Sequence, residues 1–350
     1  MDTLIEEIKK KLNNKINFEE EIPKFSGSGY KPFKISKNNF HKIKKTDNNY
    51  NKKLAFIDGG NLEILKAADF SLNLIRVYYS IYEHNKKIKS KKYEFYALVY
   101  ADTKDEIFYK TKLFSENKEI LPDENDLIFS SFDASLKKGI HRINISRIAN
   151  VVRKFSELKV ACKAIEELNS EDILVLDGSL QSSITNESKY LDSLFKKGLE
   201  KNVLVSALSK SCTLMTDKGN SLVVVLGIIA PEGKWYYYPV VEINSLEHQA
   251  EMFFVKFHEK SKHIFRFEIF KQQKFDVDKV LSLLIENSND PIFLGYPYGL
   301  IETDRFARIS NKELDYFKTM LTLKLGKVAS KLDGHLSVRN AHDILDEVGY

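Results

Sequence analysis

Two apolar runs in this sequence end on the same dipeptide, and they constrain the fold more than any other feature. "LAFIDGG" at 54–60 and "DILVLDG" at 172–178 each carry four apolar residues into an Asp-Gly pair, at Asp58 and Asp177. Short continuous apolar runs are typical of the buried strands of a parallel sheet. Asp-Gly also marks tight turns, so two unrelated surface turns are the alternative interpretation. A turn needs no apolar run of this length ahead of it, so we predict two buried strands that end at the aspartates.

The pattern along the chain predicts an α/β fold with a mixed sheet. Three β-rich runs come first, and a polar hairpin tip at 84–92 separates the second from the third. Helix, strand, helix and strand then follow, with Ser146 as the N-cap of the first helix. A β-rich part comes next, which either extends the first sheet or forms an insertion. The predicted strands are 54–60, 70–83, 92–101, 172–177, 202–210, 221–230, 234–243, 251–258 and 263–270, and the predicted helices are 146–168, 187–200, 276–287, 311–325 and 338–347.

These elements suggest one large domain behind a short N-terminal region. Residues 1–20 carry apolar residues at helical spacing, and residues 24–53 are rich in Lys, Asn, Gly and Ser, so we expect a basic helix and a mobile connection over 1–53. The main domain then spans 54–350. Within it we expect a core at 54–210, an antiparallel β-rich extension at 221–270 and a helical part at 276–350.

Composition narrows the class of protein. The net charge is +5, too small to indicate a nucleic-acid binder by itself, and the only cysteines are Cys162 and Cys212. Two cysteines exclude a disulfide scaffold and a cysteine-rich zinc site, and they suit a reducing compartment. No apolar run approaches the roughly 20 residues of a membrane span, and the N-terminus lacks the apolar region of a signal peptide. We therefore expect a cytoplasmic protein that does not associate with membranes.

Asp58 and Asp177 are candidate metal ligands. In open sheets, ligands bind at the carboxyl ends of the strands, where both aspartates are predicted to lie. Two carboxylates brought together raise each other's pKa unless a cation neutralises them. Hard oxygen ligands suit Mg²⁺ or Mn²⁺.

Helix geometry indicates a third carboxylate. The helix 146–168 feeds the strand 172–177, so the two run antiparallel, and the strand rises roughly 16 Å at ~3.3 Å per residue. A helix needs about 11 residues at ~1.5 Å each to regain that height, and counting back from Leu168 reaches Glu157. Two aspartates on strands and a glutamate on the helix form the acidic triad of ribonuclease H-like nucleases. Those enzymes cleave phosphodiesters with two metal ions ~4 Å apart.

The ordered series of motifs resembles the NurA nucleases of archaea over about residues 54–347. The motifs are "FIDGGN", "FSLNLIRVYYSIYE", "LVLDGSL", "VSALSKS", "FLGYPYGLIETDRFARIS" and "NAHDILD". The resemblance implies a ribonuclease H-like core, a homodimer, and Mn²⁺-dependent cleavage of single-stranded DNA with 5′ to 3′ resection of duplex ends. It also implies a hexameric HerA-type ATPase as partner in double-strand break repair.

The resemblance carries roles onto particular residues. Asp58, Asp177 and Glu157 match the family's acids, and His342 in "NAHDILD" matches its C-terminal histidine, a metal ligand or proton donor. Asp304 lies at an acidic family position, and either Tyr296 or Tyr298 falls in the tyrosine-bearing motif. From their positions alone, the candidate contacts to DNA are Lys210, Arg76, Arg266, Arg305 and Arg308.

Two other classes of function compete with a nuclease. The first is a non-catalytic ribonuclease H-like module that binds DNA or an ATPase; a dead site, however, has no reason to keep three acids together. The second is an actin-like or kinase-like phosphotransferase, which would need a duplicated domain that 350 residues with a β-rich second half can hardly hold. A haloacid dehalogenase-type phosphatase would need a second aspartate at position 60, where this chain has Gly60.

Overall fold

The fold is a mixed α/β arrangement built on one long twisted sheet. The computed structural model describes residues 1–13, 21–44, 52–103, 105–329 and 331–332. The sheet has 11 strands in the order β3-β12-β14-β15-β10-β9-β4-β5-β6-β7-β8, and two small sheets pair β1 with β11 and β2 with β13. The strands are β1 Pro23–Lys24, β2 Tyr30–Pro32, β3 Phe40–Lys42, β4 Leu54–Lys66, β5 Phe70–Glu83, β6 Lys86–Thr103, β7 Ile107–Phe114, β8 Phe129–Ser130, β9 Ile173–Asp177, β10 Leu204–Ser209, β11 Met215–Thr216, β12 Trp235–Tyr237, β13 Val241–Ile243, β14 Ala250–Lys256 and β15 Phe265–Phe270.

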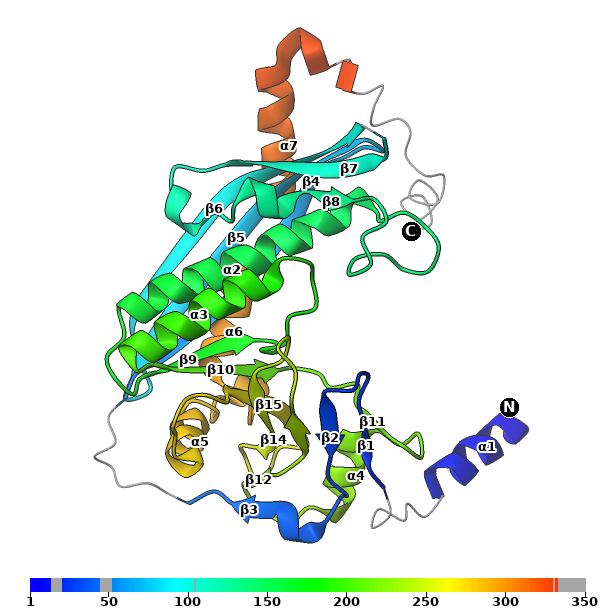
Figure 1. Cartoon of the computed structure of the whole chain (residues 1–350), viewed down its shortest axis with the longest axis vertical. Coiled ribbons are helices and arrows are strands. Elements are labelled where there is room, and N and C mark those ends of the chain that lie inside the picture. The colour runs from blue at the N-terminus through cyan, green and yellow to red at the C-terminus, as the bar shows by residue number, and fades with distance from the viewer. Residues whose placement is uncertain (14–20, 45–51, 104, 330, 333–350) are drawn as a thin grey trace.

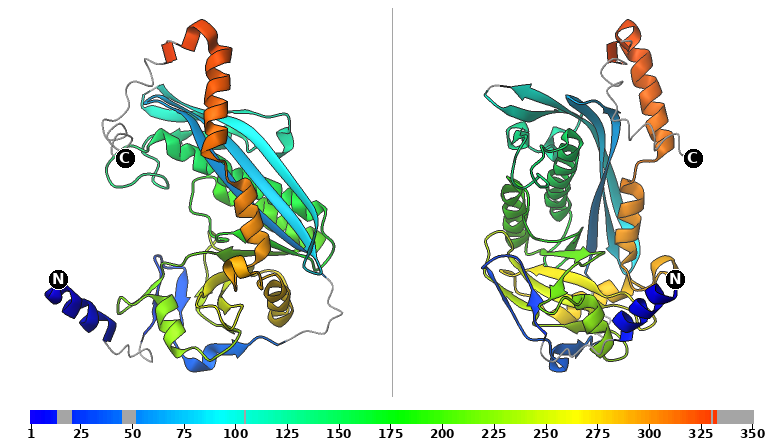
Figure 2. Two further views of the ribbon diagram at one scale, coloured as in Figure 1. Left: turned by 180° about the vertical axis from the view of Figure 1, so that it is seen from behind. Right: turned by 90° about the vertical axis from the view of Figure 1, so that its right-hand side faces the viewer.

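Helices cover both faces of this sheet. The two long helices α2 and α3 lie on one face, and α6 and α7 lie on the other (Figures 1 and 2). The largest apolar core lies under α2, where Phe155, Leu158 and Val151 pack against the sheet residues Ile75 and Val77. The helices are α1 Asp2–Asn13, α2 Ile148–Glu166, α3 Glu187–Lys201, α4 Leu222–Ile229, α5 Val277–Glu286, α6 Tyr298–Ala307 and α7 Asn311–Leu325. The predicted fold class, a mixed sheet flanked by helices, is confirmed.

The centre of the sheet is parallel, as the Asp-Gly runs predict. β9 pairs in parallel with both β4 and β10, and the remaining neighbours in the long sheet are antiparallel. The β-rich part extends this sheet through β15, β14 and β12, so it is not a separate insertion. No helix of the described residues is long and apolar enough to cross a membrane.

The expectation of a mobile connection over residues 24–53 is wrong for its described part. The strands β1, β2 and β3 pair with β11, β13 and β12, so this segment adds edges to three sheets. Its few apolar residues explain why: Ile35 is buried, and the Phe40 ring meets the Trp235 ring edge-on at a centroid distance of 4.8 Å. These apolar residues are too far apart along the chain to form the alternating pattern that predicts a strand.

Three local predictions also need correction. The run 221–230 contains the helix α4, because Leu222, Val225, Leu226 and Ile229 are its buried residues and recur at helical spacing. The hairpin tip 84–92 shrinks to a two-residue turn at His84 and Asn85, both with positive φ as such turns require. The prediction of Ser146 as N-cap is wrong because a 3₁₀ turn at Ile145–Arg147 precedes α2, and the Asn144 side chain caps that turn.

The pattern missed β7, β8 and α6, and the last predicted helix, 338–347, lies outside the described residues. Of these, α6 matters most for the site. It is short, and Pro297, Gly299 and Thr303 in and beside it weaken the helical signal.

Candidate metal centre

The Asp-Gly-Gly segment lies inside a strand. β4 continues from Leu54 through Asp58 to Lys66, so both the turn interpretation and the prediction that the strand ends at Asp58 are wrong. What ends at this point is the pairing with β9, which covers residues 54–57, whereas the pairing with β5 continues. Asp58 therefore stands where its parallel neighbour stops, beside Asp177 at the end of β9.

Gly59 and Gly60 let two helices approach β4 from opposite faces. A Cβ at Gly59 would lie 2.9 Å from the Glu157 Cγ on α2. A Cβ at Gly60 would lie 3.0 Å from the backbone carbonyl carbon of Ala307 on α6, and nearer still to its oxygen. Real Cβ atoms do not come so close, so the missing side chains are needed for α2 and α6 to pack here.

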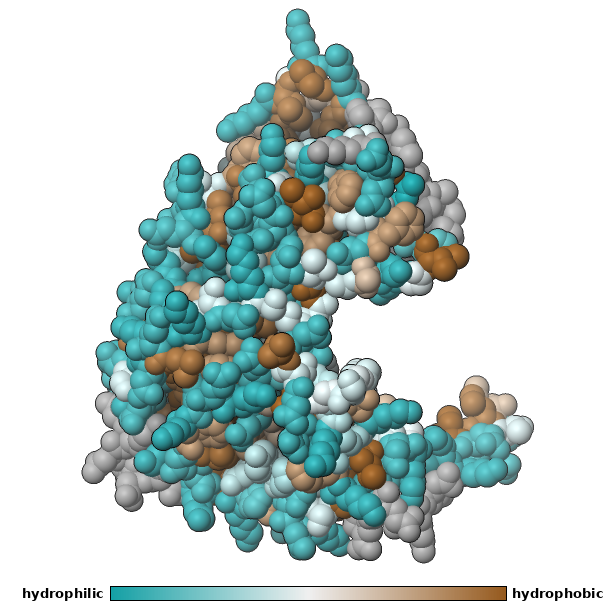
Figure 3. Space-filling model, viewed as in Figure 1, coloured by the Kyte–Doolittle hydropathy of each residue, from teal (hydrophilic) through white to brown (hydrophobic). Residues whose placement is uncertain are grey.

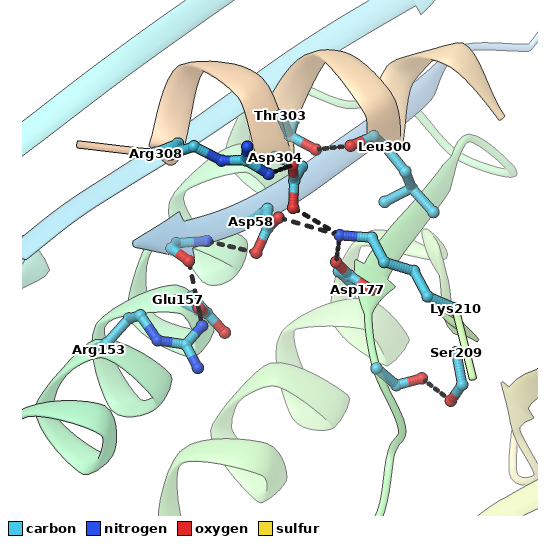
Figure 4. A network of polar contacts seen from close by, with 12 residues as sticks. Asp58, Arg153, Glu157, Asp177, Ser209, Lys210, Leu300, Thr303, Asp304 and Arg308 are labelled. Atoms are coloured by element: carbon cyan, nitrogen blue, oxygen red, sulfur yellow. Dashed lines mark hydrogen bonds and ion pairs between the residues drawn. The ribbon is translucent and has the colours of Figure 1, made fainter. Parts of the chain in front are cut away.

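Three aspartates from three elements meet beside these glycines. Carboxylate oxygens of Asp58 on β4, Asp177 on β9 and Asp304 on α6 lie within 4.8 Å of one another. We call these three residues the aspartate trio. Figure 4 shows the Lys210 side chain, from just after β10, entering the trio. Its Nζ lies 2.6 Å from Asp177 Oδ2, 2.7 Å from Asp304 Oδ1 and 3.8 Å from Asp58 Oδ2.

Burial and neighbouring charges shift the pKa values of Asp58 and Lys210. Burial and the carboxylates of Glu157 and Asp177 raise the pKa of Asp58 to about 8, although Lys210 and the Gly59 N–H act in the opposite direction. Burial alone would lower the pKa of Lys210, but Asp177 and Asp304 raise it above its ordinary value. Crowded like charges contribute to the raised pKa of Asp58, and the ammonium of Lys210 offsets part of this effect.

Glu157 lies on the other side of Asp58, close to the height that the helix count predicts. It is buried on α2, but its carboxylate is ion-paired with Arg153, which also donates from Nη1 to the Gly59 carbonyl at 3.1 Å. Glu157 is thus a neighbour of the trio and not a member of it. Arg153 was missed in the sequence, although the spacing of four between Arg153 and Glu157 on a helix signals such a pair.

Tyr296 supplies a buried hydroxyl beside the trio. It is 1% exposed, and its OH has no hydrogen-bond partner among the described residues. Burial first, and then Asp177, Asp58 and Asp304, raise its pKa. Tyr298 begins α6 and packs edge-on against Tyr82 instead. Of the two candidate tyrosines, Tyr296 is therefore the one near the carboxylates.

The residues present fit a divalent cation. The trio offers hard oxygen ligands, and the unpartnered Tyr296 hydroxyl could bind a water or an ion in the same space. The trio could hold a metal ion, while the identity of that metal is not fixed by the donor set, since Mg²⁺ and Mn²⁺ both accept carboxylates.

Two of the predicted DNA contacts are wrong because the side chains are engaged inside the protein. Arg76 is buried and donates to Glu94, to Glu313 and to the Arg308 carbonyl, so it joins α7 to the sheet. Arg266 is largely buried, with its Nε 3.1 Å from the buried Glu268 carboxylate.

The other predicted DNA contacts are not buried in ion pairs as Arg76 and Arg266 are. Arg305 and Arg308 are exposed on α6 and at its end, and Arg308 also pairs with Asp304 at 3.0 Å. Lys210, predicted to contact a phosphate, contacts the trio. His342 lies outside the described residues.

Acids gathered where the parallel pairing of β4 and β9 ends, on a mixed sheet with helices on both faces, are the arrangement expected of a ribonuclease H-like fold. The profile of the NurA domain matches residues 52–309, so the chain belongs to the NurA family, as the motifs predict. The crystal structure of the NurA nuclease from Sulfolobus solfataricus is similar in fold. At 15% sequence identity and a TM-score of 0.53, the match covers 93% of this chain and 94% of that one.

A weaker similarity is to endonuclease V of Ciona intestinalis in complex with a 24mer DNA. There the identity is 10% and the TM-score 0.39, over 76% of this chain and 87% of that one. No curated protein sequence matches the chain.

Proposed function

We propose that this chain is a metal-dependent DNA nuclease. The aspartate trio is the observation that carries the proposal, because three carboxylates within 4.8 Å around a single ammonium group form a site for a cation. Membership of the NurA family and the likeness in fold to a NurA nuclease support the same reaction.

The metal would be Mn²⁺, or Mg²⁺, held by Asp58, Asp177 and Asp304. Two such ions, if bound there, would supply an activated water and would stabilise the leaving oxygen of a phosphodiester. The chain's own residues have separate parts in this scheme. Asp58 and Asp177 hold the centre from the sheet, and Asp304 closes it from α6.

Glu157 is the residue next to Asp58 that could complete the set. Its ion pair with Arg153 orients the buried carboxylate, and Arg153 in turn is fixed by the Gly59 carbonyl. Tyr296 would orient a water from its buried position. Displaced from the trio, Lys210 would neutralise a phosphate of the DNA. His342 remains a candidate proton donor.

The finer parts of the proposal come from the family. They are a preference for single-stranded DNA and for 5′ to 3′ resection of duplex ends, a homodimer, and a hexameric HerA-type ATPase that drives DNA toward the nuclease. We include a cytoplasmic location, with which the free thiols of Cys162 and Cys212 agree.

A gel assay on end-labelled single-stranded DNA, with and without Mn²⁺, tests the proposal. Asp58→Ala, Asp177→Ala and Asp304→Ala should each slow cleavage by about 100-fold or more, the scale on which one group that stabilises transition-state charge contributes. Asp315→Ala, on the exposed surface of α7, is the matched control and should cut at the wild-type rate. Cleavage at the wild-type rate by an Asp177 variant would refute the proposal.

One observation favours a second function. Lys210 already balances part of the charge of the trio, as a cluster without metal would require. In a non-catalytic module that binds DNA or an ATPase, this lysine would remain in place, and Mn²⁺ would neither bind nor support cleavage. Calorimetric titration of the wild type with Mn²⁺ separates the two functions.

A further inference from the structure

The connection between β8 and α2 presents an exposed basic tip. All six residues of 137–142, "KKGIHR", are exposed, while Leu136 and Ile143 on either side of them are buried. We call residues 137–142 the basic finger. Gly139 turns its tip with a φ of +66°, and Ile140 beside it is 88% exposed.

Hydrogen bonds hold the base of the finger in place. The Tyr109 hydroxyl donates to the Ile143 carbonyl at 2.8 Å, and the Ile143 N–H donates to the Ser131 carbonyl at 2.8 Å. Arg147 donates to the Leu136 carbonyl. An exposed tip on a fixed base loses little further backbone freedom when it binds a ligand.

The charge of the finger is available to a ligand. The nearest acid in the connection, Asp133, is engaged locally, since it accepts from Ser135 N at 2.8 Å and from Thr185 Oγ1 at 3.0 Å. Among the described residues, no ion pair involves Lys137, Lys138 or Arg142. Three exposed basic side chains therefore have no carboxylate partner in the part of the chain that the structure describes.

An aromatic side chain stands beside these charges. Phe132 is 46% exposed, and the Arg142 guanidinium lies 5.7 Å from the centre of its ring. Basic groups next to an exposed ring and an exposed aliphatic side chain are the combination that holds a nucleic-acid strand, by its phosphates and by its bases.

The finger lies at the same end of the sheet as the aspartate trio. α2 begins right after the connection and runs antiparallel to β9, so the start of α2 is near the carboxyl end of β9, where Asp177 lies. Lys154, six residues into α2 and so about 9 Å along it, already lies beside Gly178. The Thr185 contact ties the connection to the segment that follows Asp177.

The shape of the surface agrees with this position. In Figure 1 the connection extends toward the side to which the arrows of β9 and β10 point. Figure 3 shows a deep indentation on that side of the molecule. A strand that runs to the trio along the indentation would pass the finger.

We propose that the basic finger binds the DNA strand on its way to the aspartate trio. Lys137, Lys138 and Arg142 contact successive phosphates, and Ile140 rests against the bases. This inference rests on the proposed nuclease function for its choice of ligand, and it adds the surface by which that ligand is held.

The test is binding without cleavage. Fluorescence anisotropy of a 5′-fluorescein-labelled 20-nucleotide thymidine strand is measured in EDTA at several salt concentrations. Each phosphate contact to a single strand contributes about 0.7 to the slope of log Kd against log salt, so Lys137→Ala/Lys138→Ala/Arg142→Ala should lower the slope by about 2. Ile140→Ala should weaken binding with an unchanged slope, because it removes an apolar contact only.

Charge alone is controlled with a second triple variant. Lys118→Ala/Lys196→Ala/Lys201→Ala removes three exposed lysines elsewhere and should leave the slope at the wild-type value. An equal slope for the finger variant and the wild type would overturn the inference, as would an equal loss in both triple variants. A change in the mass of the finger variant by light scattering would also overturn it, since the finger would then hold another protein chain.

The outcome is separate from that of the nuclease assay. Loss of binding in the finger variant, in a protein whose wild type does not cut DNA with Mn²⁺, would support the finger and refute the nuclease. Mn²⁺-dependent cutting together with an unchanged slope would do the reverse.

Discussion

Replacing Gly60 with alanine should destabilise the protein more than the same change at Gly59. The Cβ at Gly60 would press on the backbone of α6 at Ala307, which cannot rotate away, so the helix must shift. The Cβ at Gly59 would press mainly on the side chain of Glu157, which can rotate at the cost of its pair with Arg153. We expect a loss of about 3 kcal/mol in the free energy of unfolding for Gly60→Ala and about 1 kcal/mol for Gly59→Ala.

Thermal unfolding followed by circular dichroism measures this difference. At about 2 °C per kcal/mol for a chain of this size, the melting temperatures should fall by about 6 °C and about 2 °C. Each substitution also lowers the entropy of the unfolded chain by the same amount, so this contribution cancels in the comparison. Equal melting temperatures, or a larger fall for Gly59→Ala, would refute the view that α6 is wedged against β4 at this point.

Three further predictions concern charges and the buried hydroxyl. Lys210→Met should lower the free energy of unfolding of the metal-free protein by about 1 to 2 kcal/mol, a moderate value because the lysine side chain is 38% exposed. In a melting experiment, Mn²⁺ should restore this stability. A loss that Mn²⁺ leaves unchanged would count against the cation site. Tyr296→Phe removes a hydroxyl that has no partner among the described residues, so the free energy of unfolding should change by less than about 1 kcal/mol. The affinity for Mn²⁺ in a calorimetric titration should fall. An unchanged affinity would argue that the hydroxyl does not face the ion. Hydrogen bonds from Arg76 and the Ser310 N–H lower the pKa of Glu313 from 4.5 to about 2, so its stabilising effect is present above about pH 4.5 and lost as the pH falls toward 2. The stability gap between wild type and Glu313→Gln should therefore be constant near neutral pH and close in acid, and a gap that widens in acid would contradict the assignment.

The sequence predicts the centre of the fold well because the signal there is local. Four consecutive apolar residues before Asp177 indicate a strand buried on both faces, and α2 shows its apolar face over five turns. β9 and β10 pair in parallel because the helix α3 forms the crossover between them.

The failures share a cause, which is that the deciding contacts are distant in sequence. In the sequence, Gly60 indicates a turn. The reason for this glycine is the close approach of Ala307, which is far away along the chain. Helix geometry predicts the third carboxylate at Glu157 on α2, because counting residues along the helix and the strand relates that position to Asp177. Asp304 lies on α6, whose composition does not predict a helix, so only the family resemblance indicates this residue.

Arginines were the least predictable candidates. Arg76 and Arg266 look like exposed positive charges in the sequence, yet Arg76 pairs with glutamates on β6 and α7, and Arg266 pairs with the buried Glu268 of its own strand. Since a guanidinium serves a protein carboxylate as readily as a phosphate, position along a strand cannot separate the two roles.

Calorimetric titration with Mn²⁺ of the metal-free wild type, Asp304→Asn and Glu157→Gln tests the central claim most directly. If Asp58, Asp177 and Asp304 share a cation, the wild type binds Mn²⁺, Asp304→Asn weakens the binding by tenfold or more, and Glu157→Gln weakens it less. A wild type that takes up no Mn²⁺, or an Asp304→Asn variant that binds it as tightly as the wild type does, would contradict the account.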